Sequence, residues 1–473
     1  MFAETLIKWI LLLAGITYGV AGFAQTGPEK ILLETDSLAS NYPQKLVYLQ
    51  PDKGIYEIGE DIWFKGYIMD SRLLVPAYRD TTLYVLLLTA DGSKIVLEEK
   101  VVINNGFASG HLYVRNTLEP GDYLLAACTS GSFPGNSGEF KAFRKLKIRS
   151  KKVNARFSLS EKTSPLTLEF FPEGGNLVAG LKNTVAFKAS GADGRPADIK
   201  GTLYEENSPL ADIGTLHQGI GKFVFSPDPG KSYFVKVAGI DSLYPLSEIH
   251  REGLTLRLRN NTAKQVSFMA AKTKGVPYEK IVISAQVRGV VYALYQGKMK
   301  NDSVYFSLPA HKFPQGIVEV TLYNEALEPL AERLVYVNPQ HRLTIHTQLS
   351  RPAYEGKDKV KLQIKVTGTN HEPVVAHLGI SVYDRFYKNP EDNLTILSYT
   401  HLHSQIRGTI ADPDQYFNEE NENRARDLDL LLMTQGWRKY VWRTEELRKS
   451  VKYPAVLTDR VNGNVKNKKH QPL

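Results

Sequence analysis

Few side chains in this sequence have the types and spacing that catalysis needs. The single cysteine, Cys128, lies in the strand-like run YLLAAC at residues 123–128, where a small buried core residue is expected rather than a nucleophile. The chain has no Gly-x-Ser-x-Gly elbow and no phosphate loop ending in Gly-Lys-Ser/Thr. The segment HEP at residues 371–373 opens no His-Glu-x-x-His zinc helix, because its proline interrupts the pattern and His377 falls at the wrong spacing. We therefore expect no catalytic residues and no enzyme activity.

Two groups of residues could bind a metal, but neither group has all the features of a metal site. His401 and His403 lie on one face of a predicted strand and are a feasible metal pair, but no third ligand is evident nearby. Two exposed strand histidines are therefore expected. A second group could hold calcium but lacks the spacing and central glycine of an EF-hand loop, which favours a solvated acidic loop. That group comprises Asp412, Asp414, Glu419, Glu420 and Glu422. We expect neither a metal nor another cofactor.

The elements that would position such residues are strands. Alternating apolar residues predict strands over 61–68 and 107–114, and the continuous apolar run at 83–88 is typical of a strand buried on both faces. Turn residues separate these runs, as in a β-sandwich. Aromatic residues at strand spacing form either cross-strand packing or a surface that binds carbohydrate or protein. They are Trp63, Tyr67, Tyr84 and Tyr113.

The strand pattern recurs along the chain. A strand, a turn with glycine and a second aromatic-rich strand occur around Gly121, Gly230 and Gly316. These glycines are 109 and 86 residues apart, which is one sandwich domain per step. A second repeat is formed by YEIGEDI at residues 56–62 and the similar YEGKDKV at residues 354–360. Each segment is expected to form the turn that leads into the second strand of a domain. The fold class predicted is therefore all-β, with tandem antiparallel sandwiches.

Composition and charge agree with this organisation. The chain has 473 residues, of which 42% are hydrophobic and 23% charged, so wholesale disorder and a polytopic membrane protein are excluded. Residues 436–473 hold ten basic and three acidic residues, and only +2 of the total charge of +9 remains for residues 1–435. Because the positive charge belongs to the tail, a general nucleic-acid-binding role is excluded.

The amino terminus has the features of a secretory signal peptide. Lys8 precedes an apolar run at residues 9–16, and small residues follow, with cleavage expected after Ala24. An uncleaved membrane anchor is the alternative, but the run is short for a bilayer span. An exported chain with one cysteine forms no internal disulfide, which fits a bacterial envelope protein.

Four segments carry a resemblance to a known family. They are YLQPDKGIYEIGE at 48–60, FFPEGGNL at 170–177, GTIADPDQYF at 408–417 and LDLLLMTQGWR at 428–438. The first resembles the opening of a macroglobulin-type domain, and the others resemble later segments of large exported proteins of Gram-negative bacteria. The segment VNGNVKNKKHQPL at 461–473 resembles the first strand and turn of a carboxypeptidase-regulatory-like domain. In such proteins a domain that resembles the plug of TonB-dependent receptors follows. The alternative for these last residues is a disordered basic tail.

Composition and resemblance together predict seven units. They are a signal peptide (1–24), a macroglobulin-like sandwich (31–150), a second sandwich (153–250), a third (251–338), a fourth (341–411), an acidic loop with a docking helix (412–450, helix at 424–440) and the start of a truncated carboxypeptidase-regulatory-like domain (455–473).

The resemblance implies a role in binding rather than catalysis. Alpha-macroglobulins that trap proteases covalently use a Cys-Gly-Glu-Gln thioester segment, which this sequence lacks. We expect a non-enzymatic, exported binding or scaffold protein of the periplasm or outer membrane, with an envelope protein as partner and a possible link to TonB-dependent uptake. Membrane association would come through a C-terminal module beyond this sequence. The alternative is a macroglobulin-like endopeptidase inhibitor that works on a protease without a thioester.

Overall fold

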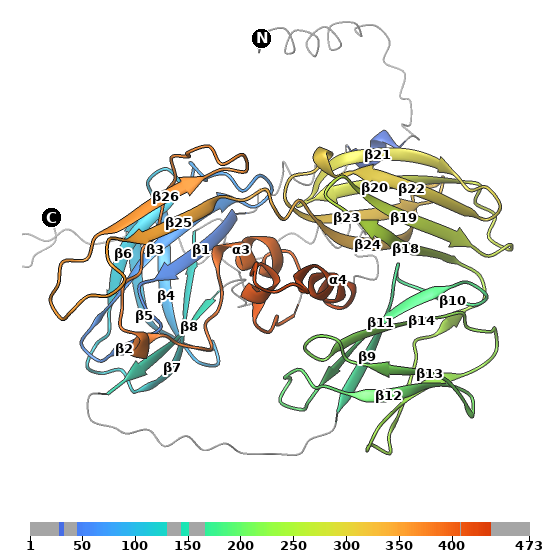
Figure 1. Cartoon of the computed structure of the whole chain (residues 1–473), viewed down its shortest axis with the longest axis horizontal. Helices are drawn as coiled ribbons and strands as arrows, with labels where there is room; N and C mark the ends of the chain where they lie inside the picture. The colour runs from blue at the N-terminus through green and yellow to red at the C-terminus, as the bar shows by residue number, and fades with distance from the viewer. Residues whose placement is uncertain (1–27, 33–44, 130–142, 151–165, 407, 437–473) are drawn as a thin grey trace, which may run out of the picture.

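The computed structural model describes residues 28–32, 45–129, 143–150, 166–406 and 408–436. Most of these residues form antiparallel β-sheets, and short helices lie between the sheets (Figure 1). The predicted all-β sandwich fold is therefore confirmed. The expected signal peptide and the segment at 455–473 lie outside the described residues. Among the described residues, no helix is long and apolar enough to span a bilayer.

The first sandwich occupies residues 45–149. Its first sheet has the order β1-β3-β6, and its second sheet has the order β2-β8-β7-β4-β5. The strands are β1 (Lys45–Pro51), β2 (Ile55–Glu57), β3 (Asp61–Asp70), β4 (Thr82–Thr89), β5 (Ile95–Val102), β6 (Phe107–Tyr113), β7 (Gly121–Cys128) and β8 (Phe143–Arg149). The strands predicted over 61–68, 83–88 and 107–114 are thus present as β3, β4 and β6.

The second sandwich occupies residues 167–250 and pairs a sheet β14-β11-β9 with a sheet β13-β12-β15-β16. Its strands are β9 (Thr167–Pro172), β10 (Leu177–Val178), β11 (Asn183–Ser190), β12 (Lys200–Glu205), β13 (Ser208–Gly214), β14 (Ile220–Phe225), β15 (Tyr233–Val237), β16 (Leu243–Pro245) and β17 (Ile249–His250). The short strands β10 and β17 pair in parallel with each other.

The third sandwich occupies residues 254–337 and pairs a sheet β18-β19-β22 with a sheet β21-β20-β23-β24. Its strands are β18 (Leu254–Asn261), β19 (Gln265–Lys272), β20 (Lys280–Val287), β21 (Val290–Lys298), β22 (Ser303–Pro309), β23 (Gly316–Tyr323) and β24 (Pro329–Val337), with a short turn of helix, η2 (Ala310–Lys312), after β22.

The three sandwiches share one strand order, and the sequence repeats mark the same step in each. The turns at Gly121, Gly230 and Gly316 connect β6 to β7, β14 to β15 and β22 to β23. In every case the chain passes there from the three-stranded sheet to the larger one. Each sandwich also encloses a separate hydrophobic core between its two sheets. The repeats are therefore copies of the crossover between sheets.

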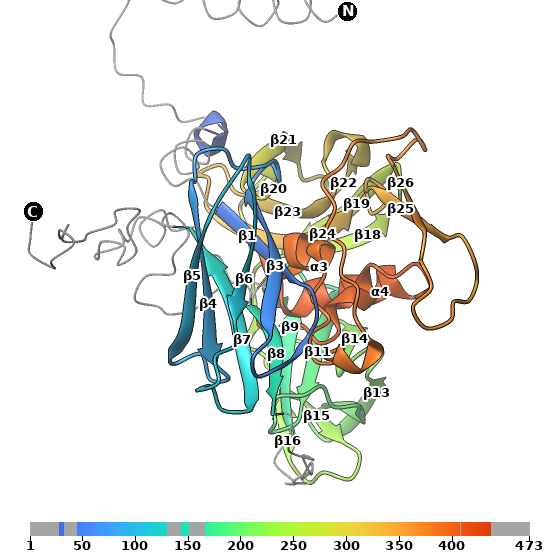
Figure 2. The same cartoon turned by 90° about the vertical axis from the view of Figure 1, so that its left-hand side faces the viewer.

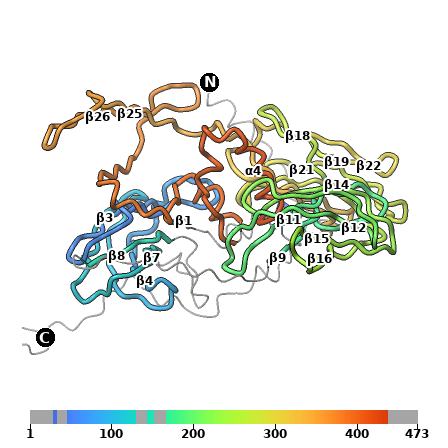
Figure 3. Tube along the Cα trace, turned by 60° about the horizontal axis from the view of Figure 1, so that its bottom comes forward, coloured from blue at the N-terminus to red at the C-terminus, as the bar shows by residue number. Residues whose placement is uncertain are grey.

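Residues 341–411, predicted as a fourth sandwich, do not form one in the described structure. They contain β25 (Thr344–Leu349) and β26 (Leu362–Thr367), which pair only with each other. Figure 2 shows this pair away from the strands of the first sandwich, and Figure 3 shows it standing apart from the neighbouring sheets. The chain then runs without regular strands along the first sandwich, with a short helical turn η3 (Arg385–Tyr387). Residues 373 and 374 still bond to the end of β26, but from residue 377 to residue 389 the chain makes its contacts with the first sandwich instead.

A helical module lies between the sandwiches, as Figure 1 shows for α3 and α4. It comprises α3 (Ile396–Ser398), the π-helical turn η4 (Tyr399–His403), the short helix η5 (Pro413–Tyr416) and α4 (Arg424–Thr434). The helix expected at 424–440 is thus present as α4, and residues beyond 436 are outside the described part. Side chains of α4, including Leu428, Leu431 and Leu432, share a core with Ile220 of the second sandwich and Leu334 of the third. The expected docking helix therefore packs between two sandwiches.

One buried cation joins this helix to both sandwiches. Arg333 on β24 is only 4% exposed, and its Nε donates to Glu173 Oε1 at 2.9 Å and its Nη2 to Asp429 Oδ1 at 2.5 Å. Lys222 on β14 reaches the other oxygen of Asp429 at 3.2 Å. Burial would lower the pKa of Arg333, but the two carboxylates outweigh it and raise that pKa. Residues 173 and 429 belong to two of the sequence motifs, so these motifs meet at Arg333.

The turn that carries Glu173 requires glycine. Gly174 has φ +89°, a left-handed conformation that is strained for other residues, and a Cβ there would lie 2.9 Å from the Leu256 backbone nitrogen. The close approach lets Glu173 Oε1 accept a second hydrogen bond from the Leu258 backbone N–H at 2.8 Å. The glycine thus brings the second sandwich against β18 of the third.

We predict that Arg333→Met strongly destabilises the assembly of the second sandwich, the third sandwich and α4. Removing one partner of a buried ion pair leaves uncompensated charge, here on Glu173 and Asp429, at a cost of roughly 3–5 kcal/mol. The matched control is Arg195→Met, which removes the solvent-exposed Arg195–Asp193 pair and should leave stability nearly unchanged. Urea unfolding followed by circular dichroism tests this, and equal midpoints for both variants would contradict it.

Candidate functional site

Residues 377–396, called here the strap, cross the outer face of the sheet β1-β3-β6. The His377 ring stacks on Phe107 of β6 with ring centroids 3.9 Å apart. Lys65 of β3 donates from Nζ to the Leu378 carbonyl oxygen at 2.6 Å. The strap therefore covers aromatic and basic side chains that β1, β3 and β6 turn away from their own core.

The strap also binds the backbone of the first sandwich at its far end. The Gly54 N–H donates to the Tyr387 carbonyl oxygen at 3.0 Å, and Asn389 Nδ2 donates to the Lys145 carbonyl oxygen at 2.8 Å. A Cβ at Gly54 would lie 2.6 Å from the Asn389 Cβ. Gly54, part of the first sequence motif, thus has no room for a side chain because the strap packs against it.

A buried ion pair fixes the strap. Arg144 of β8 donates to both carboxylate oxygens of Asp392, with the shortest distance 2.7 Å, and also to Tyr48 Oη at 2.9 Å and the Leu49 carbonyl at 3.1 Å. Burial would lower the pKa of Arg144, but Asp392 and Tyr48 outweigh it and raise that pKa. Tyr48 in turn donates to the Leu394 carbonyl oxygen at 3.2 Å, and burial raises its pKa.

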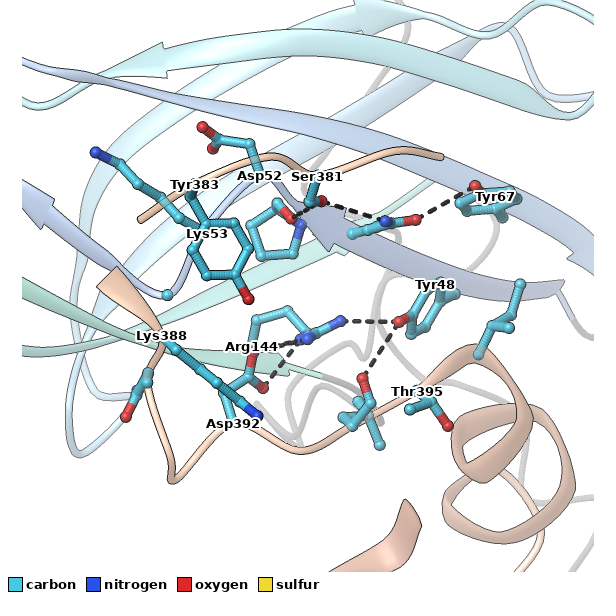
Figure 4. Close-up of a pocket in the computed structure, with 16 residues that line it drawn as sticks. Tyr48, Asp52, Lys53, Tyr67, Arg144, Ser381, Tyr383, Lys388, Asp392 and Thr395 are labelled. Carbon is cyan, nitrogen blue, oxygen red and sulfur yellow. Dashed lines mark hydrogen bonds and ion pairs between the residues drawn. The ribbon is translucent and has the colours of Figure 1, made fainter. Parts of the chain in front are cut away.

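A cavity of about 340 Å³ opens between the strap and β1 (Figure 4). This volume lies in the range of small-ligand pockets. Its lining is rich in hydroxyl, amide and aromatic groups and comprises Tyr48, Gln50, Pro51, Asp52, Lys53, Gly54, Tyr67, Arg144, Ser381, Tyr383, Lys388, Asn389, Asp392, Leu394, Thr395 and Ile396.

Most charges in this lining already have partners. Arg144 is held by Asp392, and Lys53 Nζ lies 2.8 Å from Glu60 and 4.3 Å from the Tyr387 ring centroid. Gln50 Nε2 donates to Ser381 Oγ at 3.3 Å, as Figure 4 shows. Other hydroxyl and amide groups of the lining also bond to one another or to backbone carbonyls. A polar molecule in this cavity would therefore use their remaining hydrogen-bonding capacity beside the tyrosine rings.

The prediction that His401 and His403 are exposed strand residues was wrong. Both lie in the helical turn η4, and His401 is buried between the rings of Tyr336 and Phe417, with centroids 5.9 and 6.3 Å away. Its Nδ1 has no hydrogen-bond partner among the described residues. Burial, assisted by Arg288, lowers the pKa of His401 to about 3.

The other candidate residues are dispersed. Cys128 is buried in β7, and burial raises the pKa of its thiol to about 12, which disfavours the nucleophilic thiolate. In the acidic loop, Glu419 pairs with Arg342 and Asp412 accepts a hydrogen bond from Asn393. Within the described ranges, no group of three or more His, Cys, Asp or Glu residues is arranged to hold a metal.

The aromatic residues divide between core and surface. Tyr84 and Tyr67 are buried, the latter beneath the strap, and Trp63 and Tyr113 are about half exposed on the outer face of β3 and β6. Trp63 lies against His111 with ring centroids 4.6 Å apart. Packing is thus confirmed for Tyr67 and Tyr84, and a binding role for the exposed Trp63 and Tyr113 stays a prediction.

Sequence reasoning missed the two charged residues that organise the strap and the helical module. Arg144 and Arg333 look like ordinary strand residues, and their partners lie far away along the chain. The signal available for Arg333 was that it and Glu332 are the only charged residues in the otherwise apolar run PLAERLVYV at residues 329–337. The signal available for Arg144 was that it interrupts the alternation of β8, FRKLKIR, by taking a position on the same face as the buried Leu146 and Ile148.

The comparisons with known proteins find similarity of structure only. No family model matches the chain, and no curated protein matches it in sequence. Among solved structures, the chain is similar to Escherichia coli alpha-2-macroglobulin activated by porcine elastase, with 11% identity over 69% of this chain and 33% of that one and a TM-score of 0.22. Salmonella alpha-2-macroglobulin reacted with methylamine gives 11% identity over 68% of this chain and 25% of that one, with a TM-score of 0.18.

A bacterial adhesin is similar to the same degree. The Escherichia coli adhesin FdeC gives 13% identity over 63% of this chain and 98% of that chain, with a TM-score of 0.17. The chain thus spans about a quarter to a third of the macroglobulins' length. At these identities and TM-scores the similarity transfers no function. The class that the structure itself defines is a multi-domain antiparallel β-sandwich protein.

We predict that His401 makes the protein sensitive to acid. In the unfolded chain the imidazole binds a proton below its ordinary pKa of about 6.5, whereas in the folded protein it stays neutral down to about pH 3. Stability should therefore fall as the pH drops from about 6.5 towards 3.

Melting temperatures of the wild type and His401→Leu at pH 7.5 and pH 4.5 test this prediction. The decrease between the two pH values should be smaller in His401→Leu. The control is His346→Leu, because this histidine is exposed on β25. An unchanged decrease in His401→Leu would show that other groups cause the acid sensitivity.

Proposed function

We propose that this protein is an exported, non-enzymatic binding and scaffold component of a bacterial cell envelope. The observation that carries the proposal is the set of exposed apolar side chains between the end of β26 and the end of η3. Val375 is fully exposed, and Val382 and Phe386 remain more than 80% exposed. Clustered exposed apolar side chains on a folded protein mark sites of interaction with other molecules.

The surrounding structure supports a scaffold. Arg333 and the core shared by α4 bind the second and third sandwiches into one frame, and the Arg144–Asp392 pair attaches the strap to the first sandwich. A frame held in this way presents its exposed segments in defined positions, which lowers the conformational cost of binding a partner. The cavity beside the strap adds a place for a polar group of the partner.

The proposed location in the envelope rests on the sequence. Lys8, the apolar run at 9–16 and the small residues before Ala24 are typical of an export signal. A link to TonB-dependent uptake is supported only by the resemblance of residues 461–473 to the start of a carboxypeptidase-regulatory-like domain. It is part of the proposal on that basis.

The proposal predicts a partner within reach of Val375. We would replace Val375 with the photo-crosslinking residue p-benzoylphenylalanine in the full chain and irradiate intact cells. A higher-mass adduct in the envelope fraction is expected. The control places the same residue at Val224, which is also a valine and is about half exposed on the second sandwich. Adducts from neither position, or identical adducts from both, would count against the proposal.

A second candidate function, inhibition of an endopeptidase without a thioester, is favoured by the same exposed segment. Arg385 is exposed there and follows residues 377–384, which form no strand, so a protease can reach this backbone. Trypsin should cut near Arg385 and then lose activity towards protein substrates while retaining it towards small chromogenic ones. Cleavage that leaves trypsin fully active on protein substrates would dispose of this candidate.

A further inference from the structure

The pair β25–β26 repeats the pairing that begins the first sandwich. In β1–β3, Leu49 lies opposite Gly66, and in β25–β26, Thr347 lies opposite Ile364. Both partners are shifted by the same 298 positions along the sequence, so the pairing register is the same in the two strand pairs. The two strands are therefore placed as the first two strands of a sandwich's three-stranded sheet.

The connecting turn is also the same. The Lys53 N–H donates to Tyr56 Oη at 3.2 Å, and at the equivalent place the Arg351 N–H donates to Tyr354 Oη at 3.1 Å. Each of these basic side chains then pairs with an acidic residue seven positions later. The two pairs are Lys53–Glu60 at 2.8 Å and Arg351–Asp358 at 3.0 Å. The repeated sequence thus forms a repeated structure.

What differs is the burial of the inner face. Val47 and Phe64, on the inner face of β1 and β3, are 7% and 5% exposed. Their equivalents Ile345 and Leu362 are 55% and 42% exposed. The alternation of β26 places Ile364 and Val366 on this same face, opposite a polar face. The described residues hold no second sheet that covers it.

The charged residues near this exposed apolar face indicate which molecule or segment could cover it. Four lysines, Lys357, Lys359, Lys361 and Lys365, have no ion-pair partner among the described residues. A second copy of the face would bring like charges together, which disfavours self-association. The chain's own residues 437–473 carry a net charge of +7 and are disfavoured for the same reason. An acidic occupant is complementary to these lysines.

We infer that β25–β26 is an open half of a β-sandwich that acidic β-strand segments of a partner protein complete. The inference rests on the proposed binding function and names the surface and the chemistry of its partner. Alternate apolar residues of the partner strand pack on Ile345, Leu362 and Ile364. Its backbone pairs with the open edge of β26, as β6 pairs with β3 in the first sandwich, and its carboxylates face the lysines beside β26.

Two synthetic peptides provide the test. One alternates Glu and Val over twelve residues, and the other alternates Lys and Val. Fluorescence anisotropy of the labelled peptides with the full-length protein should show at least about tenfold tighter binding of the Glu-Val peptide, a difference that decreases as NaCl is raised.

The variant Ile345→Lys should weaken binding of the Glu-Val peptide at least about tenfold, because it places a charge in the apolar face. Ile345 is half exposed, so this variant should fold, and its melting temperature checks that. Val224→Lys is the control on another exposed strand position. Equal binding of both peptides, or equal effects of both variants, would overturn the inference.

Two further outcomes separate this inference from the proposed function. Sedimentation velocity that shows a wild-type dimer, dissociated by Ile345→Lys, would identify a second copy as the occupant and refute the acidic partner. In the photo-crosslinking experiment, an envelope adduct that persists in Ile345→Lys would preserve the proposed function and refute the role of this face.

Discussion

The arrangement of this protein depends on a guanidinium group that has been removed from water. Arg333 lies between Glu173 and Asp429, which come from the second sandwich and from α4, so three separately folded parts must be in place before its charge is neutralised. Burying an ion pair costs desolvation energy that the Coulomb attraction repays only with good geometry. The Gly174 turn brings Glu173 into position, and Lys222 forms an ion pair with Asp429, so both carboxylates are held in the geometry that the pair requires. Specific placement, rather than added stability, is what such a pair contributes.

The local part of this structure could be predicted from the sequence. Period-two alternation located β3 and β6, and the apolar run located β4, because side chains on a strand alternate between core and surface. The glycine turns predicted the number of repeats, because each marks the crossover between sheets. The repeated motif at 354–360 predicted the beginning of a fourth unit, and β25–β26 has that beginning.

The long-range part could not be predicted in the same way. Asp392 and Arg144 are 248 positions apart, and neither residue's neighbours indicate the other. The strand prediction for His401 failed because spacing of two also fits a helical turn whose residues pack against several partners, here Tyr336 and Phe417. A complete fourth sandwich was predicted because its first two strands obey the pattern, but residues 377–396 bind the first sandwich instead.

The Arg144–Asp392 pair also determines how the chain would carry tension. It closes a loop of 248 positions that contains the whole of the second and third sandwiches. A pull applied between the amino-terminal part of the first sandwich and the chain immediately after the strap, before α4, is transmitted across this short connection, because the enclosed sandwiches lie outside the shortest path between these two points. They become part of the mechanical path only after the pair has ruptured. In a protein anchored in a cell envelope, the Arg144–Asp392 pair would break first under tension. The chain would then extend before any sandwich unfolds.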